Sequence, residues 1–485
     1  MGLSASAGAA ESELLSVKPP ASTVHENHGV FTPRPHRSPA ERRSQGKSLR
    51  AKTAREDHGG WKAPKDRRDP VEIVLASNAG RREELVPIRH GRMLQSPFAF
   101  FRGSAALMAA DLANTPVSGI RVQACGDAHM MNFGAFATPE RGVIFDINDL
   151  DETLPAPWEW DLKRLVASIV LAGRHLGHRE REAASAARAA TRSYREHMAE
   201  YAVMRVLDIW YDKIDLDRLL ANVSDSVRET ARRRIEKAHA RTTLEHDFPK
   251  LVEQAGSTPR IKDNPPLIFH PPELDAKEMA ARMAKGLDLY HSSLPEHVRV
   301  MFDRFHYYDA AIKVVGVGSV GTLCMVLLFM SRDDDPLFLQ VKEANASVLE
   351  PYAGKSLHEN HGQRVVAGQR LLQAASDIFL GWSTGVAGRH FYVRQLHDTK
   401  VSAVIEGAGP EELETYGQLC AWALARGHAR SGDPAMISGY IGSGETFDEA
   451  ICEFAVDYAD QVNEDYKRFA KAVREGRVKA TVEQP

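Results

Sequence analysis

Residues 125–132 read CGDAHMMN, and residues 143–152 read VIFDINDLDE. The first segment carries Asp127 and, five residues later, Asn132. The second begins as a short apolar strand, predicted from Gly142 to Phe145, and continues in a series of aspartates. Carboxylate and amide oxygens are the ligands that a hard cation such as Mg²⁺ prefers. The two segments therefore predict a loop and a strand end that together hold a metal ion.

The interval between Asp127 and Asn132 is the one that protein kinases use in their catalytic loop. Phosphoryl transfer requires a carboxylate beside the attacking hydroxyl, and metal ligands near the phosphates. We assign Asp127 to the hydroxyl, and we assign Asn132 and Asp146, which leaves the end of the predicted strand, to Mg²⁺. Asp149 and Asp151 compete with Asp146 for the metal. Counted from Asp146 or Asp149, the sixth loop position lacks the glycine of an EF-hand, which excludes that calcium site.

The order of these motifs resembles the aminoglycoside phosphotransferase and related kinase-like families. The resemblance rests on GDAHMMN, on the strand that ends in aspartate, and on WEWDL at residues 158–162. Those families often have a histidine where this chain has Cys125. The resemblance implies that Asp161 braces the catalytic loop, although Asp161 could equally begin a helix and favour its dipole. His129 lies in an extended stretch, where we expect it to face away and to be structural.

A glycine segment lies far downstream, at Gly316, Gly318 and Gly321. An apolar run from Thr322 to Met330 follows it, and a turn rich in aspartate separates that run from a further strand, Leu337 to Val341. In a dinucleotide-binding fold the glycines would open a helix. The order strand, loop, strand instead favours a glycine loop whose backbone N–H groups lie over the phosphates of ATP.

Lys342 follows the last of these strands, where protein kinases carry the lysine that contacts the nucleotide phosphates. The other interpretation is an ordinary lysine in solvent at the end of a strand. A kinase lysine also pairs with a helix glutamate. The helix predicted over residues 358–376 offers Glu359, while Glu343 and Glu350 are also available.

The parts of this site occur in an unusual order, because the catalytic loop comes long before the glycine segment. We therefore predict an α+β, two-lobed protein kinase-like fold that is circularly permuted, with the helical catalytic lobe first and a small β-rich lobe later. Folds tolerate permutation because chain termini commonly lie close together at the surface. The predicted regions are a disordered tail (1–70), a helical catalytic region (71–305), a β-rich nucleotide-binding region (306–400) and C-terminal helices that pack on the helical lobe (401–485).

A second resemblance covers the chain from about residue 85 onward. The segments QSPFAFFRG (95–103), CGDAH, PWEWDLKR and GQRLLQAASDIFLGW (368–382) are similar to a bacterial family of domains of unknown function, numbered twenty-two fifty-two. This resemblance implies no activity. Within the first segment, Arg102 could bind an anion, but a helix arginine that packs its stem against aromatic neighbours is the favoured interpretation.

The bulk properties fit an enzyme of the cytoplasm. The chain has 485 residues, 43% hydrophobic and 26% charged, enough for one large or two modest domains. Its formal net charge of −3 gives no general attraction to nucleic acid. Four scattered cysteines lack Cys-x-x-Cys spacing, which argues against a disulfide framework and a zinc site. No segment reaches the ~18 apolar residues of a membrane span, and the N-terminus lacks the core of a signal peptide.

Together these features predict an ATP- and Mg²⁺-dependent phosphotransferase that acts on a hydroxyl of a small molecule or a protein. Two alternatives remain open. One is an AMP transferase or another metal-dependent phosphoester enzyme with the same acidic residues, and the other is a non-catalytic nucleotide sensor. A second segment with the look of a catalytic loop, HARSGD at residues 428–433, has Ser438 five residues after its aspartate and is predicted to end a helix.

Overall fold

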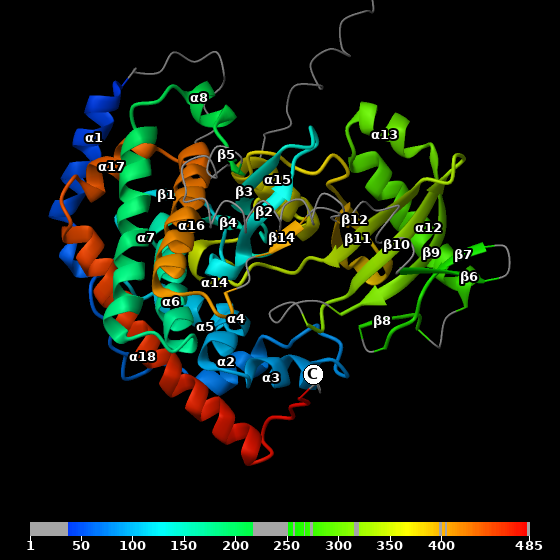
Figure 1. Cartoon of the computed structure of the whole chain (residues 1–485), viewed down its shortest axis with the longest axis horizontal. Coiled ribbons are helices and arrows are strands. Elements are labelled where there is room, and N and C mark those ends of the chain that lie inside the picture. The colour runs from blue at the N-terminus through cyan, green and yellow to red at the C-terminus, as the bar shows by residue number, and fades with distance from the viewer. Residues whose placement is uncertain are drawn as a thin grey trace, which may run out of the picture.

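The computed structural model describes most of the chain, and helices dominate one side of the molecule while strands dominate the other (Figure 1). The architecture is therefore mixed α and β. No helix among the described residues combines the length and the apolarity needed to cross a bilayer. The described residues are 37–216, 251–255, 258–265, 267–271, 275–314, 320–396, 400–402 and 405–482.

The helices and strands carry the labels of Figure 1. The helices are α1 (Pro39–Ser48), α2 (Pro70–Ala76), α3 (Val86–Met93), α4 (Pro97–Gly103), α5 (Ala105–Leu112), α6 (Trp158–His175), α7 (Glu180–Tyr201), α8 (Val206–Tyr211), α12 (Ala276–Ser293), α13 (Glu296–Phe302), α14 (Glu350–Ala353), α15 (His361–Leu372), α16 (Pro410–Ser431), α17 (Pro434–Ile441) and α18 (Thr446–Arg474). The strands are β1 (Arg121–Ala124), β2 (Phe133–Ala137), β3 (Val143–Ile147), β4 (Leu154–Pro157), β5 (Ile214–Asp215), β6 (Val252–Ala255), β7 (Thr258–Ile261), β8 (Ile268–Phe269), β9 (Phe305–Lys313), β10 (Cys324–Ser331), β11 (Pro336–Glu343), β12 (Gly381–Thr384), β13 (His390–Gln395) and β14 (Lys400–Ser402).

The β-rich side is built on one antiparallel sheet with the strand order β12-β13-β11-β10-β9-β8. Strands β10 and β11 come from long apolar runs and are buried along almost their whole length. Helices α12 and α13 belong to the core on one face of the sheet, which carries Leu327 and Val341. Strands β6 and β7 contribute to the core on the other face, at Val326 and Leu328. Successive side chains of a strand point to opposite faces, so Lys342 lies on the face opposite Val341.

A second, smaller sheet supports the segment that carries the aspartates. It has the order β14-β2-β3-β5, and strands β1 and β4 pair separately. Every residue of β3 is buried. This strand runs to Ile147, two residues beyond the predicted end at Phe145, so that Asp146 lies within it, opposite Gly134 of β2.

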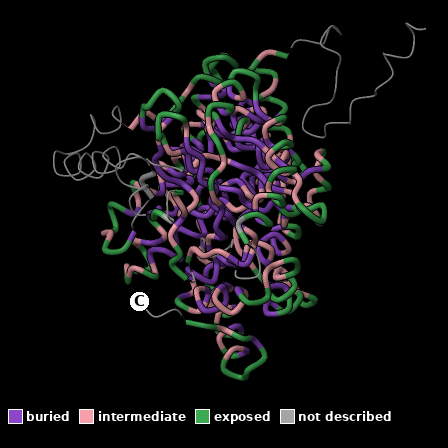
Figure 2. The backbone as a smooth tube through the Cα atoms, turned by 90° about the vertical axis from the view of Figure 1, so that its right-hand side faces the viewer, coloured by how far each residue is buried: buried purple, intermediate pink, exposed green. Residues whose placement is uncertain are grey.

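Helix α6 forms the centre of the helical side, because its residues from Trp158 to Gly173 are all buried. Helices α7, α16 and α18 pack against it, and buried backbone fills the interior in Figure 2. The Trp158 ring stacks on Tyr194 of α7 with ring centroids 5.6 Å apart. The C-terminal helices thus pack on the helical part of the chain.

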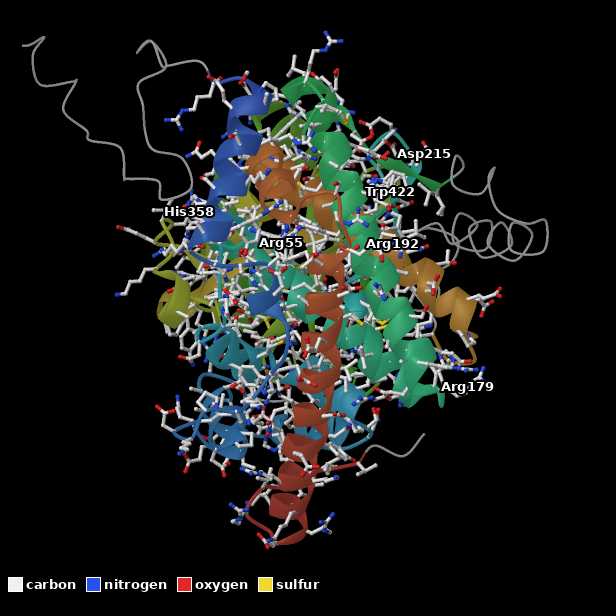
Figure 3. The ribbon with its side chains drawn as sticks, turned by 90° about the vertical axis from the view of Figure 1, so that its left-hand side faces the viewer. Arg55, Arg179, Arg192, Asp215, His358 and Trp422 are labelled. Carbon is white, nitrogen blue, oxygen red and sulfur yellow. The ribbon has the colours of Figure 1, made fainter. Side chains whose placement is uncertain are left out.

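The outer face of this helical part is charged. Arg192 of α7, labelled in Figure 3, pairs with Glu445 at the start of α18 at 2.7 Å, and Arg188 pairs with Glu449 at 2.6 Å. All four side chains are exposed, so each pair contributes only about 0–1 kcal/mol to stability. Helix α16 ends at Ser431 as predicted for the HARSGD segment, and Asp433 caps the next helix.

Residues 37–70 are folded, so the prediction of a disordered tail over residues 1–70 is wrong for this part. Ser38 forms a capping box with Glu41 at the start of α1, and α1 packs against α17. Arg67 pairs with Asp111 at 2.8 Å and with Asp465 at 2.6 Å. The polar composition misled the prediction because distant partners hold this segment. Residues 1–36 of the predicted tail lie outside the described residues.

Candidate functional site

A cavity of about 320 Å³ is lined by residues from both groups of motifs. Its volume is typical of a small-molecule site. The upstream loop contributes Asp127, His129 and Asn132, and the segment after β3 contributes further acidic residues. The β-rich side contributes Thr322 and Glu343. The structure therefore brings the sequence neighbours of Gly321 and Lys342 to the same cavity as Asp127, although Gly321 and Lys342 themselves do not line it.

Asp161 fixes the loop that leads to Asp127. The backbone N–H of Cys125 donates to one oxygen of the Asp161 carboxylate at 2.5 Å, and the N–H of Gly126 donates to the other at 2.9 Å. The ring of His428 on α16 lies 3.2 Å from the same carboxylate. Gly126 has a φ of +87°, and a Cβ there would lie 2.3 Å from the carbonyl oxygen of Glu152. A side chain here would be strained by the positive φ and would clash with the Glu152 carbonyl, so this position requires glycine.

Asp127 is oriented by Arg164, one helical turn beyond Asp161 on α6. The Arg164 Nε donates to Asp127 Oδ1 at 2.5 Å, and its guanidinium lies over the ring of Phe101. Asp127 Oδ2 lies 3.9 Å from His129 Nε2, beyond hydrogen-bonding distance. Burial raises the pKa of Asp127, and the positive charge of Arg164 acts in the opposite direction. One carboxylate oxygen is thus engaged by an ion pair and the other is available to a ligand.

His129 lines the cavity, so the prediction that it faces away is wrong. The reason is a 3-10 turn over Met130–Asn132, in which the N–H of Asn132 donates to the carbonyl of His129 at 2.8 Å. Burial, with the charges of Arg164 and Arg102, lowers the pKa of His129 well below its usual value, so the ring is neutral. Asn132 Nδ2 donates to the backbone carbonyl of Asp127 at 2.8 Å, which leaves its Oδ1 for other partners.

Asp146 does not line the cavity, and its assignment as a metal ligand is corrected. Its side chain is fully buried. Both of its carboxylate oxygens lie 2.7 Å from one guanidinium nitrogen of Arg426 on α16. One of them also accepts a hydrogen bond from the backbone N–H of Ala374 at 2.7 Å. Because Asp146 lies inside β3, its side chain enters the core and holds α16 in place.

Of the three aspartates that compete for the metal, Asp149 and Asp151, beyond the end of β3, line the cavity. Lys342 Nζ donates to Asp151 Oδ2 at 2.8 Å and lies 3.7 Å from Asp149 Oδ2. The hydroxyl of Tyr392 donates to the other oxygen of Asp151 at 2.5 Å. The lysine side chain is nearly buried, with 5% of its surface exposed. It therefore does not fit the alternative of a strand-end lysine in solvent.

The pKa values of the two aspartates are shifted in opposite directions. Burial and the neighbouring charge of Asp151 raise the pKa of Asp149. Burial also acts to raise the pKa of Asp151, but Lys342 and the Tyr392 hydroxyl outweigh it and the pKa falls below its usual value. The pKa of Lys342 is raised well above its usual value, because the two aspartates outweigh the effect of burial. The Lys342 ammonium is the positive charge that compensates this acidic pair.

Of the predicted glycine loop, Gly316 and Gly318 lie outside the described residues. Gly321 has a φ of +91°, and a Cβ there would lie 3.1 Å from the Cβ of Arg81. The side chain of Arg81 also reaches back to this segment and donates to the carbonyl of Val320 at 2.6 Å. The described end of the glycine segment is therefore tied to the loop between α2 and α3.

Glu359, one of three glutamates left open as a partner of Lys342, does not pair with it. Glu359 is exposed to solvent ahead of α15, and Lys342 pairs with aspartates instead. Arg364 of helix α15 contacts the aspartate segment. It donates to the backbone carbonyls of Thr153 at 2.6 Å and of Asp151 at 2.8 Å. Helix α15, the second helix after the lysine strand, thus holds the backbone of the aspartate segment.

Of the other two glutamates, Glu343 accepts a hydrogen bond from the N–H of Leu323 at 2.9 Å, and Glu350 lies 3.9 Å from His361. Glu343 lines the cavity and Glu350 does not. Neither glutamate forms an ion pair with Lys342 within the described part of the chain.

Cys125 lies beside the site but is not suited to be a nucleophile. It is fully buried, and burial together with Asp161 raises the pKa of its thiol well above the usual value. Within the described ranges, no three or more His, Cys, Asp or Glu side chains are grouped to hold a metal ion by themselves. A cation here would need further ligands, such as phosphate oxygens.

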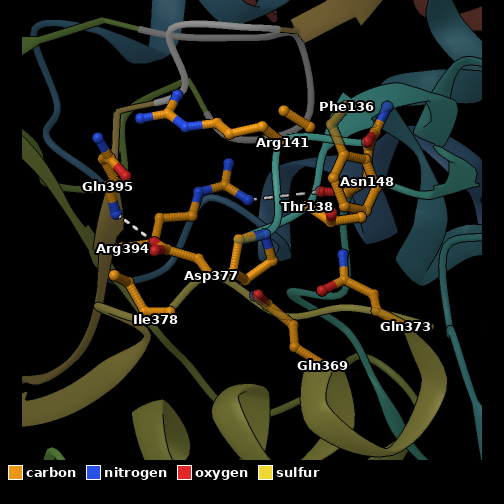
Figure 4. A pocket seen from close by; sticks show the side chains of 12 residues that line it. Phe136, Thr138, Arg141, Asn148, Gln369, Gln373, Asp377, Ile378, Arg394 and Gln395 are labelled. Carbon is orange, nitrogen blue, oxygen red and sulfur yellow. Dashed lines mark hydrogen bonds between the residues drawn. The ribbon is translucent and has the colours of Figure 1, made fainter. Parts of the chain in front are cut away.

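Another, smaller cavity, of about 100 Å³, is lined by Asn148, Arg394 and Asp377 among other residues (Figure 4). Arg394 of β13 reaches the backbone carbonyl of Asn148 at 3.4 Å, and the backbone N–H of Gln395 donates to Asp377. The volume is below the range of ordinary ligand sites. Arg394 here joins the end of the β-rich sheet to the segment that carries Asp149.

Sequence reasoning missed Arg164 and Arg364, which hold the loop and the aspartate segment. Arg164 follows Asp161 by three residues, a spacing that places both on one face of a helix. That spacing could have paired Arg164 with the loop once α6 was recognised. Arg364 had no such signal, because its carbonyl partners are more than two hundred residues away.

Comparison with known proteins gives one family. The family described as an uncharacterized protein conserved in bacteria, DUF2252, matches residues 81–472. No curated protein and no solved structure matches the chain. The match includes the loop of Asp127, the aspartate segment, the lysine strand and the C-terminal helices. The chain therefore belongs to this family of bacterial proteins.

Proposed function

We propose that this protein is an ATP- and Mg²⁺-dependent phosphotransferase that acts on a hydroxyl group of a small molecule or a protein. One observation carries the proposal: Lys342 Nζ lies 2.8 Å from Asp151 and 3.7 Å from Asp149. The lysine belongs to the glycine-loop half of the sequence, and the aspartates belong to the half that carries Asp127. A single Mg-nucleotide needs both halves within reach of each other.

The arrangement of the large sheet supports a kinase-like nucleotide site. Strands β9, β10 and β11 are neighbours, the glycine segment connects the first two, and Lys342 lies on the third. Protein kinases likewise combine a glycine loop over the phosphates, a lysine on the third strand and a following helix. Here the short helix α14 follows the lysine strand first, and α15 is the first longer helix after it. Because Asp127 precedes all of these elements, the proposed fold is a circularly permuted relative of the kinase fold.

Asp127 would orient the acceptor hydroxyl and take up its proton through Oδ2, while Arg164 holds Oδ1. Burial raises the pKa of Asp127, which brings a carboxylate closer to the range in which a general base works. The neutral ring of His129 lies beside it at 3.9 Å and adds no charge that would compete for the proton. The chain thus supplies an oriented base next to the acidic pair.

Asn132, Asp149 and Asp151 fit the ligand set of Mg²⁺, which is usually held by one or two carboxylates and by substrate phosphates. Bound Mg-ATP would supply the phosphoryl group and the cation that neutralises its oxygens. Lys342 would hold the phosphates, and the described end of the glycine segment, at Gly321, borders the same cavity through Thr322. Asp146 has no part in this proposal.

The proposal is tested by incubating the protein with Mg²⁺ and ATP labelled at either the γ or the α phosphate. The acceptors offered are a mixture of small alcohols and sugars and the protein itself. Label transferred from the γ position supports the phosphotransferase. Label transferred from the α position alone supports an AMP transferase instead, and nucleotide binding without any transfer supports a sensor.

Two variants connect the result to this site. Asp127→Asn and Asp149→Asn should each reduce γ-label transfer by at least about a hundredfold, the range expected for loss of a general base or a metal ligand. Asp333→Asn, in the exposed turn between β10 and β11, is the matched control and should retain full transfer. Turnover that survives both site variants would reject these assignments.

A further inference from the structure

Three arginines, from α3, α4 and the loop between α2 and α3, line the cavity. They are Arg81, Arg89 and Arg102. None of them forms an ion pair with a carboxylate among the described residues, whereas Arg164 and Lys342, which are nearby, both do. Asp149 and Asp151 line the same cavity. Asp149 and Asp151 thus have a cation beside them, whereas none of the three arginines has a carboxylate within ion-pair distance among the described residues, although the charges of Glu152 and Glu343 act on Arg81 from further away.

Arg89 is the most deeply buried of the three, with 2% of its surface exposed. Its guanidinium donates to the side chain of Asn78 at 2.7 Å and to the carbonyl of Gly103 at 2.6 Å. These partners are neutral, and Nε has no hydrogen-bond partner in the described structure. A buried charge without a counter-charge is costly, so a protein keeps one where an anion compensates it.

Arg102 lies nearest to the chemistry. Its guanidinium lies 5.9 Å from the ring of Phe98, and its buried Nε lacks a hydrogen-bond partner among the described residues. The negative charge of Asp127 acts on Arg102, and both residues line the cavity. An anion held by Arg102 would therefore lie beside Asp127.

Arg81 contacts the glycine segment, because its guanidinium donates a hydrogen bond to the carbonyl of Val320. Its Nε also donates to the carbonyl of Ser77 at 3.1 Å, and its second terminal nitrogen has no hydrogen-bond partner among the residues that the structure describes. Arg81 is thus a positive charge of the cavity wall that its hydrogen bonds hold against the end of the glycine segment.

We propose that the acceptor of this enzyme carries an anionic group, a phosphate or a carboxylate, that binds at Arg89 and Arg102 while its hydroxyl meets Asp127. This inference deepens the proposed function and rests on it. Guanidinium groups bind such oxyanions through charge-assisted hydrogen bonds, with two parallel bonds where the geometry allows. The anion would supply the counter-charge that the two arginines lack, and it would position the hydroxyl for transfer.

The phosphates of ATP are another source of the same chemistry. In the proposed function they bind beside Asp149 and Asp151, where these aspartates and Lys342 would hold them with Mg²⁺. The two sources differ in the residues they require. Acceptor binding requires Arg102, and nucleotide binding requires Lys342.

Titration calorimetry separates the two sources, with inorganic phosphate as the anion probe and a non-hydrolysable ATP analogue with Mg²⁺ as the nucleotide probe. Phosphate should bind with the same affinity to the free protein and to protein saturated with the analogue. Arg102→Met should weaken phosphate binding at least about tenfold, the effect of losing one charge-assisted contact. The same variant should change analogue binding less than about twofold, and Lys342→Met should show the reverse pattern.

Arg102→Lys, which keeps the charge, should retain most of the phosphate affinity, and Arg181→Met on the exposed start of α7 is the matched control. A thermal melt of each variant establishes that it is folded. Phosphate that is displaced by the analogue, or bound equally well by Arg102→Met, would overturn the acceptor assignment and leave the phosphotransferase proposal standing. Binding of phosphate that depends on Arg102 in a protein that binds no nucleotide would support the anion site and reject the proposed function.

Discussion

Lys342 and Asp151 form an ion pair of 2.8 Å although 191 residues separate them in the sequence. The lysine extends from the end of β11, and the aspartate lies in the loop that follows β3. Cys324 stands opposite Lys342 on the neighbouring strand, so the lysine is anchored in the centre of the large sheet. This contact is where the helical and β-rich parts of the molecule meet at the cavity.

Lys342→Met should abolish nucleotide binding and lower the free energy of unfolding. Loss of a fully buried partner costs about 3–5 kcal/mol, but roughly a quarter to a third of each aspartate side chain is exposed, so we expect about 1–3 kcal/mol. Urea unfolding measures the loss. Lys355→Met, in an exposed loop, is the control and should leave the unfolding midpoint unchanged. An unchanged midpoint for Lys342→Met would mean that the ion pair contributes nothing to stability.

We expect substitution of Asp146 to lower the stability of the protein and substitution of Asp149 to lower its activity. Asp146→Asn leaves Arg426 buried with only neutral partners, so the free energy of unfolding should fall by about 3–5 kcal/mol. Asp149→Asn removes a partly exposed carboxylate that lies 3.7 Å from its cation, so stability should change by less than about 1 kcal/mol. Phosphoryl transfer should vanish in Asp149→Asn. Full transfer in that variant, or an unaffected melt in Asp146→Asn, would contradict these two assignments.

Gly126→Ala should displace the loop that carries Asp127. A Cβ at this position would lie 2.3 Å from the Glu152 carbonyl oxygen, and the backbone has a φ of +87°. Gly119 offers a matched control, because it has a φ of +88° but nothing within 4 Å of its Cβ position. Gly119→Ala should cost about 1 kcal/mol for the backbone alone. Gly126→Ala should cost at least ~3 kcal/mol and also remove activity. Equal unfolding midpoints for the two variants would show that the close approach does not constrain the loop.

The buried Lys163 should make the free energy of unfolding depend on pH. Its ammonium is fully buried over the ring of Phe454 at 4.5 Å, and burial lowers its pKa to about 7 while Glu159 acts in the opposite direction. The unfolded chain therefore binds a proton that the folded protein does not hold between pH 7 and 10.5. The free energy of unfolding should rise with pH across this window.

Lys163→Met removes this titration and should be more stable than the wild-type protein below pH 7, with the difference shrinking as the pH approaches 10.5. Chemical denaturation at a series of pH values measures both curves. Lys52→Met, at an exposed position, should run parallel to wild type. Parallel curves for Lys163→Met and wild type would mean that Lys163 keeps its ordinary pKa in the folded protein.

The sequence by itself determined the features that depend on local pattern. The apolar runs that became β10 and β11 and the helix that ends in the HARSGD segment follow from periodicity and from turn residues close by in the chain. The spacing of Asp127 and Asn132 likewise survives in the structure as two residues on the wall of one cavity. Such features involve neighbours in the chain, so the sequence alone specifies them.

Tertiary structure decided which of these residues meet. Strand β3 extends two residues beyond its predicted end, so that the side chain of Asp146 enters the core. There it binds Arg426, which is 280 residues away in the sequence. Lys342 pairs with Asp151 and not with Glu359 because packing of the large sheet brings β11 to the aspartate loop. The uncompensated arginines are distinguished only by burial, since an arginine with and without a counter-charge looks the same in a sequence. Electrostatic environment depends on all neighbours in space, and only the folded chain defines them.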